Sequence, residues 1–408
     1  MRLKLNLTAI EYRADPFTAF GRLRDMGTFV PARIPLIGNL WLATTYDAVN
    51  DVLKDDSLFC RNPKNAGRRN FPMLQLMMPG LFRVMAKNMI GMDEPDHRRL
   101  RSLVDQAFQR QSIDDLRPTI KQIVDDQLDY VEELAKQQNC KVELIEHLCR
   151  PVPLAAICQL LGLPAEDQPN FKKWFNSFTR IQSVWGIVKI VPGMSKTIKY
   201  LRHQIEEVRR NPRPGLMTAL VEAEQAGDRL NDQELQSMVM LLLLAGHETT
   251  VHLITNAVLT LLQMPDVRDQ LLADWTLVDP AVEEVLRYCS PVQFAKPRFV
   301  TTDTEFHGHS FKRGEVVMPC LASANYDPHR FEQPDRFIFD RPRNYHLDFG
   351  AGPHVCLGLK LARAETQIAL ERLFTRWPDL QPTFEPSTPD WSRRLGMRSL
   401  NSLEVRAA

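Results

Sequence analysis

The run Phe349-Gly350-Ala351-Gly352-Pro353-His354-Val355-Cys356-Leu357-Gly358, near the carboxyl end, is the most informative part of the chain. Two glycines, Gly350 and Gly352, allow the backbone to turn tightly beneath a flat ligand and to aim amide N–H groups at a sulfur. A helical pattern begins directly after Cys356, and the positive end of that helix would favour a thiolate. The run therefore predicts a tight turn that favours the thiolate form of Cys356, with the Phe349 ring able to shield its sulfur from water.

At every signature position this loop resembles the haem-binding loop of the cytochrome P-450 family. The resemblance implies that Cys356 is the axial ligand of the iron in haem b, and that Phe349 and His354 also lie at the cofactor. A thiolate ligand pushes electron density onto the iron and favours O–O cleavage. A buried free cysteine in a Gly-rich turn is the alternative for a lone cysteine, but it does not account for the complete string.

A long helix is predicted upstream of the cysteine loop. Asn231 and Glu234 have the spacing of an approximate capping box. The helical pattern then continues to about Met264, just before Pro265, where a helix is expected to end. At 1.5 Å per residue the helix would measure roughly 50 Å, enough to cross a whole domain.

The segment AGHETT, residues 245–250 of this helix, is the second part of the resemblance. Glycine and threonine are poor helix formers in a helix interior. In the family, an acid–threonine pair lies here in a local widening of the helix over the haem. The resemblance implies that Thr249 and Glu248 deliver protons to dioxygen and that Ala245 contacts the haem. A buried helix with one back-bonded threonine is the alternative interpretation.

Glu284 and Arg287 lie three residues apart on a short predicted helix, 279–288, so they share a face and can bind a third partner. The family supplies that partner from a later loop, and the resemblance assigns it to Arg336. The three side chains would form a buried charged cluster that holds the cysteine loop in shape. Because E-x-x-R alone usually marks a surface ion pair, the assignment depends on the order of the motifs.

The two propionates of haem need compensating donors, which the resemblance assigns to four residues. His97 and Arg101 are i,i+4 neighbours on a helix that Pro95 is suited to begin. The other two donors are Arg298 and His354, the residue two before the cysteine. Each alone would suit a solvated surface, whereas all four stand in the sequential order of the family.

The composition is that of an ordinary globular protein. The 408 residues are 44% hydrophobic and 25% charged with a net charge of +1, which gives no case for nucleic acid or an anionic membrane as partner. The seven cysteines are scattered and suit a reducing cytosol better than a disulfide framework. The N-terminus lacks an apolar signal region, and the longest apolar run, 238–246, is far shorter than the ~20 residues of a membrane span. A cytoplasmic monomer is expected.

Residues 1–408 contain no internal repeat and no Gly/Ser linker. They are predicted to form one domain of the cytochrome P-450 type, mainly α with a minor β portion, with haem between the long helix and the cysteine-loop helix. The β portion is expected at about 29–45, 298–320 and 380–408, and the first hairpin is expected to turn at Gly38-Asn39. Helical patterns fill the remainder, and Pro192-Gly193 is expected to break the helical region that ends at Arg210.

The resemblance implies a monooxygenase reaction. One oxygen atom of dioxygen enters a C–H or C=C bond of a hydrophobic organic molecule, such as a terpenoid, fatty acid or polyketide. No part of the chain is left over for flavin or iron–sulfur binding, so electrons are expected from a separate ferredoxin- or flavodoxin-type donor with its reductase. A basic docking patch or merely scattered solvated charges are the two interpretations of Arg98, Arg99, Lys360 and Arg363.

The substrate pocket is the least determined part of the resemblance. By family position its walls include residues 71–90 and 171–192, together with Leu241, Leu244, Val292, Phe294 and Met397. These walls are mostly apolar, which favours a hydrophobic substrate. Apolar residues at helical spacing are equally typical of a protein core.

Three other functions are alternatives to the monooxygenase. A haem-thiolate peroxygenase or isomerase often lacks the acid–threonine pair, which is present here. A non-catalytic haem-binding sensor or electron carrier is separated from an enzyme only by turnover. A zinc peptidase is suggested by His247 and His252, but these histidines are five positions apart rather than four, which leaves them about 140° apart around a helix.

Overall fold

The computed structural model describes residues 6, 9–34, 38–68, 88–110, 112–175, 184–225, 230–394 and 396–407. Helix accounts for 57% of the structure and strand for 11%, which confirms a mainly α fold with a minor β portion. Two compact units are present. Unit 1 comprises Met1–Arg68, Lys121–Pro151 and Thr249–Ala408, and unit 2 comprises Arg69–Ile120 and Val152–Glu248. The single domain stays a prediction.

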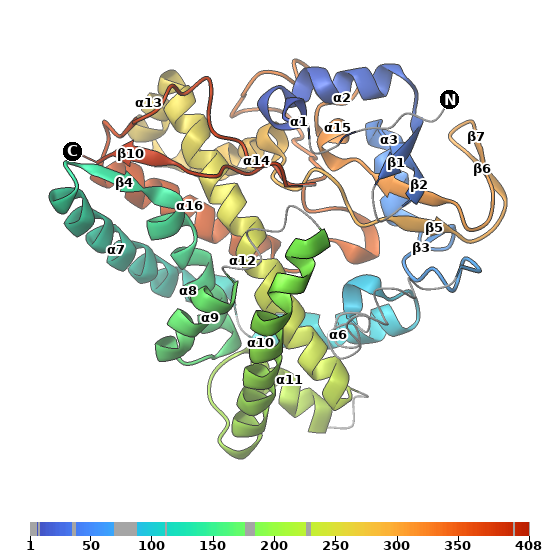
Figure 1. Ribbon diagram of the computed structural model, residues 1–408, viewed down its shortest axis with the longest axis horizontal. Coiled ribbons are helices and arrows are strands. Elements are labelled where there is room, and N and C mark those ends of the chain that lie inside the picture. The colour runs from blue at the N-terminus through green and yellow to red at the C-terminus, as the bar shows by residue number, and fades with distance from the viewer. Residues whose placement is uncertain are drawn as a thin grey trace. The chain divides into compact units, whose positions relative to one another are not determined.

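Unit 1 contains most of the short helices and α16, the helix that follows the cysteine loop, which Figure 1 labels. Its helical elements are α1 (Glu11–Ala14), α2 (Pro16–Asp25), α3 (Tyr46–Lys54), η2 (Ile145–Cys149), α13 (Pro265–Ala273), η5 (Trp275–Leu277), α14 (Val278–Cys289), α15 (Leu321–Asn325), η6 (Gly352–His354) and α16 (Leu359–Arg376). Helices α7 (Ile113–Gln137) and α12 (Asp232–Gln263) each contribute residues to both units. Unit 2 contains η1 (Met89–Gly91), α6 (Asp96–Arg110), α8 (Pro151–Leu161, from its second residue), η3 (Ala165–Asp167), α9 (Gln168–Phe175), α10 (Val184–Arg210) and α11 (Leu216–Gln225).

The strands of the described residues all belong to unit 1 and lie where the sequence predicts them, apart from β3 and β4. They are β1 (Phe29–Ile34), β2 (Gly38–Ala43), β3 (Phe59–Cys60), β4 (Lys141–Glu143), β5 (Arg298–Val300), β6 (Thr304–Phe306), β7 (His309–Phe311), β8 (Val316–Pro319), β9 (Gln381–Pro382) and β10 (Glu404–Arg406). The largest sheet has the order β1-β2-β8-β5-β3, a second has the order β4-β10-β9, and β6 pairs with β7.

The large sheet separates two apolar clusters because alternate side chains of a strand point to opposite faces. On β8, Val316 and Met318 pack into the cluster that contains Phe20 of α2, whereas Val317 packs into the cluster that contains Val49 of α3. The sheet is therefore buried on both faces, with α3 packed on one of them and β5 paired antiparallel with β3 and β8.

Helix α12 runs for 32 residues, as the sequence predicts. Its capping box is formed: the Glu234 N–H donates to Asn231 Oδ1 at 2.9 Å, and the Asn231 N–H donates to Glu234 Oε2 at 3.1 Å. By length and hydropathy alone α12 would also suit a membrane crossing. However, 67% of its most apolar window is buried inside the fold, as in the core helix of a soluble protein.

Two local predictions were wrong. The β1–β2 register pairs Ile34 with Gly38, so Gly38-Asn39 begins β2 instead of forming the turn of the hairpin. Pro192 does not break the helical region, because α10 runs through it. At the next residue, a Cβ on Gly193 would lie 2.5 Å from the Trp174 carbonyl oxygen, so α10 packs closely against α9 there. Such packing stabilises a helix despite the hydrogen bond that proline cannot donate.

Candidate active site

The cysteine loop is a tight turn that leads from His346 into α16. The Cys356 N–H donates to the Phe349 carbonyl oxygen at 2.9 Å, and the Gly350 N–H donates to the Leu347 carbonyl oxygen at 2.8 Å. Gly350 and Gly352 have φ values of +73° and +69°, in the left-handed region that favours glycine. The loop thus fixes the backbone of Cys356 shortly before α16 begins at Leu359.

Cys356 is partly accessible, unlike most of the described cysteines. Burial raises the pKa of Cys149, Cys158 and Cys320 to about 12, so these cysteines stay protonated and act as small apolar residues. Among the described cysteines, only Cys140 and Cys356 are partly accessible. Cys140 precedes strand β4, whereas Cys356 precedes a helix whose amino end favours a thiolate. The chemistry of this donor therefore fits a thiolate-ligated iron.

Gly352 and Arg298 both lie close to the Leu53 carbonyl oxygen near the end of α3. Arg298 is fully buried, and its guanidinium donates to the carbonyl oxygens of Leu53 at 3.2 Å and Phe59 at 3.1 Å. A Cβ on Gly352 would lie 2.7 Å from the same Leu53 oxygen and 2.8 Å from Lys54 Cα. The cysteine loop can approach the last turn of α3 this closely only because residue 352 has no side chain.

We expect Gly352→Ala to lower the free energy of unfolding by about 2–4 kcal/mol, because it combines a strained φ with a backbone clash. Gly308→Ala is the matched control: its φ of +72° is similar, but nothing lies within 4 Å of the added Cβ. The control should lose only about 1 kcal/mol. Equal losses in urea unfolding of the two variants would show that the contact with α3 does not matter.

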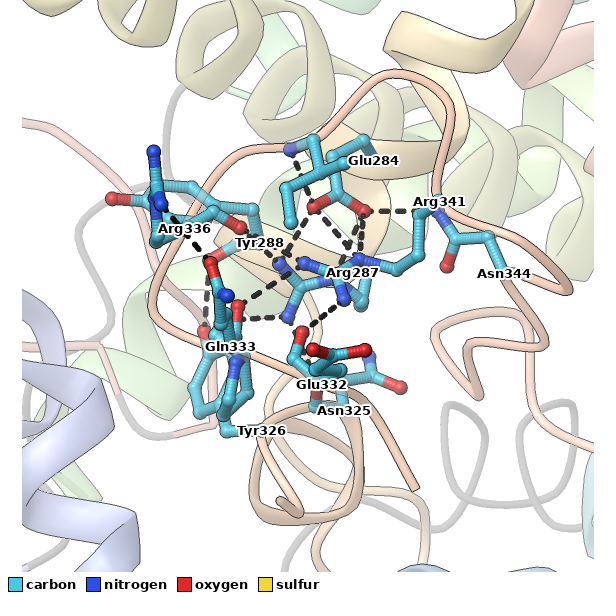
Figure 2. Close-up of polar contacts among 12 residues, drawn as sticks. Glu284, Arg287, Tyr288, Asn325, Tyr326, Glu332, Gln333, Arg336, Arg341 and Asn344 are labelled. Atoms are coloured by element: carbon cyan, nitrogen blue, oxygen red, sulfur yellow. Dashed lines mark hydrogen bonds and ion pairs between the residues drawn. The ribbon is translucent and has the colours of Figure 1, made fainter. Parts of the chain in front are cut away.

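Glu284 and Arg287 form the centre of a buried cluster in unit 1, shown in Figure 2. Both side chains are fully buried, and the Arg287 guanidinium donates to the two Glu284 carboxylate oxygens at 2.9 and 2.7 Å. Glu284 also accepts hydrogen bonds from the Ile338 N–H and from Asn344 Nδ2, each at 3.0 Å. The remaining Arg287 donors bind backbone carbonyl oxygens of Asn325, Pro334 and Arg336.

The third charged partner in this cluster is Arg341, not the predicted Arg336. Arg341 Nε lies 3.2 Å from both carboxylate oxygens of Glu284, and the side chain is buried. The Arg336 side chain points away to Gln333 Oε1, and only its backbone carbonyl oxygen joins the cluster (Figure 2). The order of the motifs predicts which loop supplies the third partner. The sequence gives no signal that distinguishes Arg336 from Arg341, which lie five positions apart in this irregular segment.

The segment 245–250 belongs to α12, which is α-helical throughout, so the local widening implied by the resemblance does not interrupt it. Gly246 has a packing role: its added Cβ would lie 3.2 Å from Ile157 Cδ1 on α8. Leu241, Leu244, Ala245, Glu248 and Thr249 are all less buried than Leu242, Leu243, His247 and Thr250. Their three- and four-residue spacing places them along one face of the helix.

The other predicted haem and pocket residues divide between the two units. His97 and Arg101 lie on one face of α6 in unit 2; His97 is buried, and Arg101 Nε lies 3.0 Å from both carboxylate oxygens of Asp105. In unit 1, Val292 and Met397 form an antiparallel bridge. Phe294 packs its ring against Phe20 in the core, with centroids 6.0 Å apart. The 71–87 and 176–183 parts of the expected pocket lie outside the described residues.

Two members of the expected basic docking patch are neutralised by acidic partners. Arg99 Nη2 lies 2.6 Å from Glu234 Oε1, and Arg363 makes two contacts, at 2.5 and 2.7 Å, with Glu283. Lys360 is exposed, and Arg98 is 82% exposed with Glu94 at 3.2 Å. Arg99 and Arg363 therefore act within the fold rather than as free surface cations.

The structure also bears on the zinc alternative. His252 Nε2 lies 3.2 Å from Arg394 Nη1, so this ring nitrogen faces a guanidinium cation. Among the residues that the structure describes, no group of three or more His, Cys, Asp or Glu side chains is arranged to hold a metal ion.

Comparison with known proteins shows the family to which this chain is similar. The family model described as "Cytochrome P450" (cytochrome P-450) matches residues 40–389. The polyketide biosynthesis cytochrome P-450 PksS of Bacillus subtilis is 36% identical over 97% of this chain and 96% of its own length. The cytochrome P-450 monooxygenase PikC of Streptomyces venezuelae is 35% identical over 99% and 94%. The crystal structure of the myxobacterial cytochrome P-450 CYP267B1 in complex with myristic acid has a TM-score of 0.88 at 34% identity, covering 98% of each chain.

Proposed function

The chain belongs to the cytochrome P-450 family, as a haem-thiolate monooxygenase that uses haem b, and we propose that Cys356 is the thiolate ligand. The observation that carries this proposal is the turn in which the Phe349 carbonyl oxygen holds the Cys356 N–H before α16. Haem b supplies the reductive activation of dioxygen; the chain positions the cofactor and the substrate and manages protons.

We propose that four residues donate to the haem propionates: His97, Arg101, Arg298 and His354. Arg298 is held by backbone carbonyl oxygens of Leu53 and Phe59, which orient its guanidinium from one side. The buried Glu284 cluster has a different role, because it ties α14 to the loop that precedes the cysteine. It keeps the shape of that loop without contacting the reacting atoms.

Thr249 and Glu248 are proposed to deliver protons to dioxygen. Both lie on the less buried face of α12, which also carries Leu241, Leu244 and Ala245. This role makes a direct prediction for Thr249→Ala. We expect the variant to consume electrons at a rate close to wild type while product per electron falls several-fold, because proton delivery and not reduction is impaired. The readout is the ratio of product formed to reductant consumed.

The matched control is Thr255→Ala on the same helix, where the hydroxyl binds the Val251 carbonyl oxygen at 2.7 Å. This variant removes a back-bonded threonine of the kind that α-helices tolerate and should leave the ratio unchanged. Full coupling in Thr249→Ala would instead favour a peroxide-using or isomerising haem-thiolate enzyme.

The proposed substrate is a hydrophobic molecule of the fatty acid, polyketide or terpenoid kind, which is hydroxylated or epoxidised. Leu241 and Leu244 lie on the accessible face of α12, and Val292 and Met397 are paired by a bridge in unit 1. The names of the relatives point the same way, since one acts in polyketide biosynthesis and one binds myristic acid. Screening such compounds for a low-to-high spin shift of the ferric protein tests this proposal.

A separate redox partner is proposed to supply the electrons, of the ferredoxin or flavodoxin type with its reductase. We also propose that the protein is a monomer located in the cytoplasm.

The most direct test of the function as a whole is the carbon monoxide difference spectrum of the reduced protein. Thiolate ligation shifts the Soret band far to the red, whereas a globin-like position would refute the proposed ligand.

A further inference from the structure

Three charged or ionisable side chains converge beside the cysteine loop in unit 1. Glu283 of α14 accepts two hydrogen bonds from Arg363 of α16, from Nε at 2.5 Å and from Nη2 at 2.7 Å. Its Oε2 also lies 3.2 Å from His346 Nε2. Burial would raise the pKa of Glu283, but the hydrogen bonds from His346 and Arg363 outweigh it and lower the pKa to about 2. Glu283 is therefore ionised at neutral pH.

His346 is held in one tautomer by this arrangement. The Asp348 N–H donates to His346 Nδ1 at 3.2 Å, so the ring proton of the neutral form lies on Nε2. That proton is then available to Glu283. One carboxylate thus connects α14, the start of the cysteine loop and α16.

Two members of this cluster, Arg363 and His346, lie beside the Phe349 ring of the cysteine loop. The Arg363 guanidinium carbon lies 4.7 Å from the centroid of the Phe349 ring, within cation–π range, and the His346 ring centroid lies 5.8 Å from the same ring. Phe349 in turn accepts the N–H of Cys356 through its carbonyl oxygen. Arg363 is thus fixed on one side by Glu283 and stacks on the other against the residue that holds Cys356.

We propose that Arg363, clamped by Glu283, is a positioning residue that holds the Phe349 ring and sets the electrostatic potential at Cys356. The pair would thereby tune how readily the haem accepts an electron. This inference rests on the proposed ligand role of Cys356. It also gives Arg363 a role within the fold, which differs from both interpretations of its sequence context, a surface docking patch and a scattered solvated charge.

The charge pattern of the pair predicts opposite effects for its two members. Glu283→Gln leaves the Arg363 cation uncompensated, which favours the more negative ferrous state and raises the midpoint potential. Arg363→Gln leaves the Glu283 carboxylate uncompensated and lowers the potential. One unit charge in such a partly exposed position should change the ferric–ferrous equilibrium constant by roughly three- to tenfold, where tenfold is 59 mV for one electron. The double variant restores neutrality and should lie close to wild type.

The variant Arg363→Lys tests whether the midpoint potential depends on the positive charge of residue 363 or on the geometry of its side chain. Lysine keeps the positive charge but lacks the planar fork that both grips Glu283 and stacks on Phe349. We expect a midpoint potential close to wild type, together with faster loss of the red-shifted carbon monoxide band on mild heating. A potential that shifts as in Arg363→Gln would contradict the assigned division between charge and geometry.

The control is a second ion pair on the same helix. Arg372 Nε lies 2.6 Å from Asp125 Oδ1, and the two side chains are about as exposed as Arg363 and Glu283. Arg372 lies ~13 Å further along α16, which exceeds the Debye length of ~8 Å at physiological salt. Arg372→Gln and Asp125→Asn should therefore leave the potential unchanged.

The experiment is a spectroelectrochemical titration of the haem-loaded full chain for all these variants, alongside their carbon monoxide spectra. Potentials that do not move in Glu283→Gln and Arg363→Gln, or that move in the same direction, would overturn the inference while leaving the proposed ligand intact. A wild-type protein without the red-shifted band would overturn the ligand assignment, and this inference with it.

Discussion

Replacing Cys356 with serine is expected to abolish the red-shifted Soret band of the reduced carbon monoxide complex. A serine hydroxyl does not supply the thiolate that pushes electron density onto the iron. Monooxygenase turnover should fall to the background rate even where the variant still binds haem. The measurement is the difference spectrum of the reconstituted variant, with turnover recorded on the same sample.

Cys140→Ser is the matched control, because Cys140 is the other partly accessible thiol among the described cysteines. Its spectrum and turnover should equal those of wild type. If Cys356→Ser kept the red-shifted band, another residue would have to supply the thiolate, and the assignment of the cysteine loop would be wrong.

Glu284→Gln should have the largest effect on stability. The substitution leaves two buried guanidinium groups, those of Arg287 and Arg341, without the carboxylate that both bind. Removing one partner of a buried ion pair costs about 3–5 kcal/mol, since the remaining charge stays desolvated. We expect a loss of this size in the free energy of unfolding, measured by urea unfolding, and a corresponding loss of bound haem during purification.

Arginine substitutions in the same loop test the identity of the third partner. Arg341→Ala should cost about 2–3 kcal/mol, because it removes charge-assisted hydrogen bonds in a buried site. Arg336→Ala should change the free energy of unfolding by no more than about 0.5 kcal/mol, because its side chain binds only Gln333 near the surface. The reverse order of the two losses would restore the assignment made from sequence.

Much of the fold is predictable because it depends on local signals. Asn231 and Glu234 satisfy each other's backbone N–H groups, and this mutual bond needs no distant part of the chain. The positive φ of Gly350 and Gly352 likewise follows from what glycine alone tolerates. Residues that usually break helices were less informative. Pro192 lies inside α10, where packing against α9 at Gly193 outweighs the tendency of proline to end a helix.

The charged residues of the site were only partly predictable. The pair Glu284–Arg287 has a helical spacing, so its mutual contact could be expected. Glu284 and Arg341 are 57 positions apart in the sequence, and Glu283 and Arg363 are 80 positions apart. Many other arginines in the chain have the same local context. Which arginine reaches a carboxylate depends on how α14, α16 and the loop between them pack.

The sequence by itself determined the cysteine loop around Cys356, the long capped helix and the class of fold, because turn chemistry, capping and hydrophobic period act over a few residues. Only the tertiary structure decided that Gly352 abuts Leu53, that Arg341 replaces Arg336 at Glu284, and that Arg363 stacks on Phe349. Burial supplies the physical reason. A charge removed from water must find its counter-charge within hydrogen-bond distance, and that distance is set by packing between elements, not by spacing along the chain.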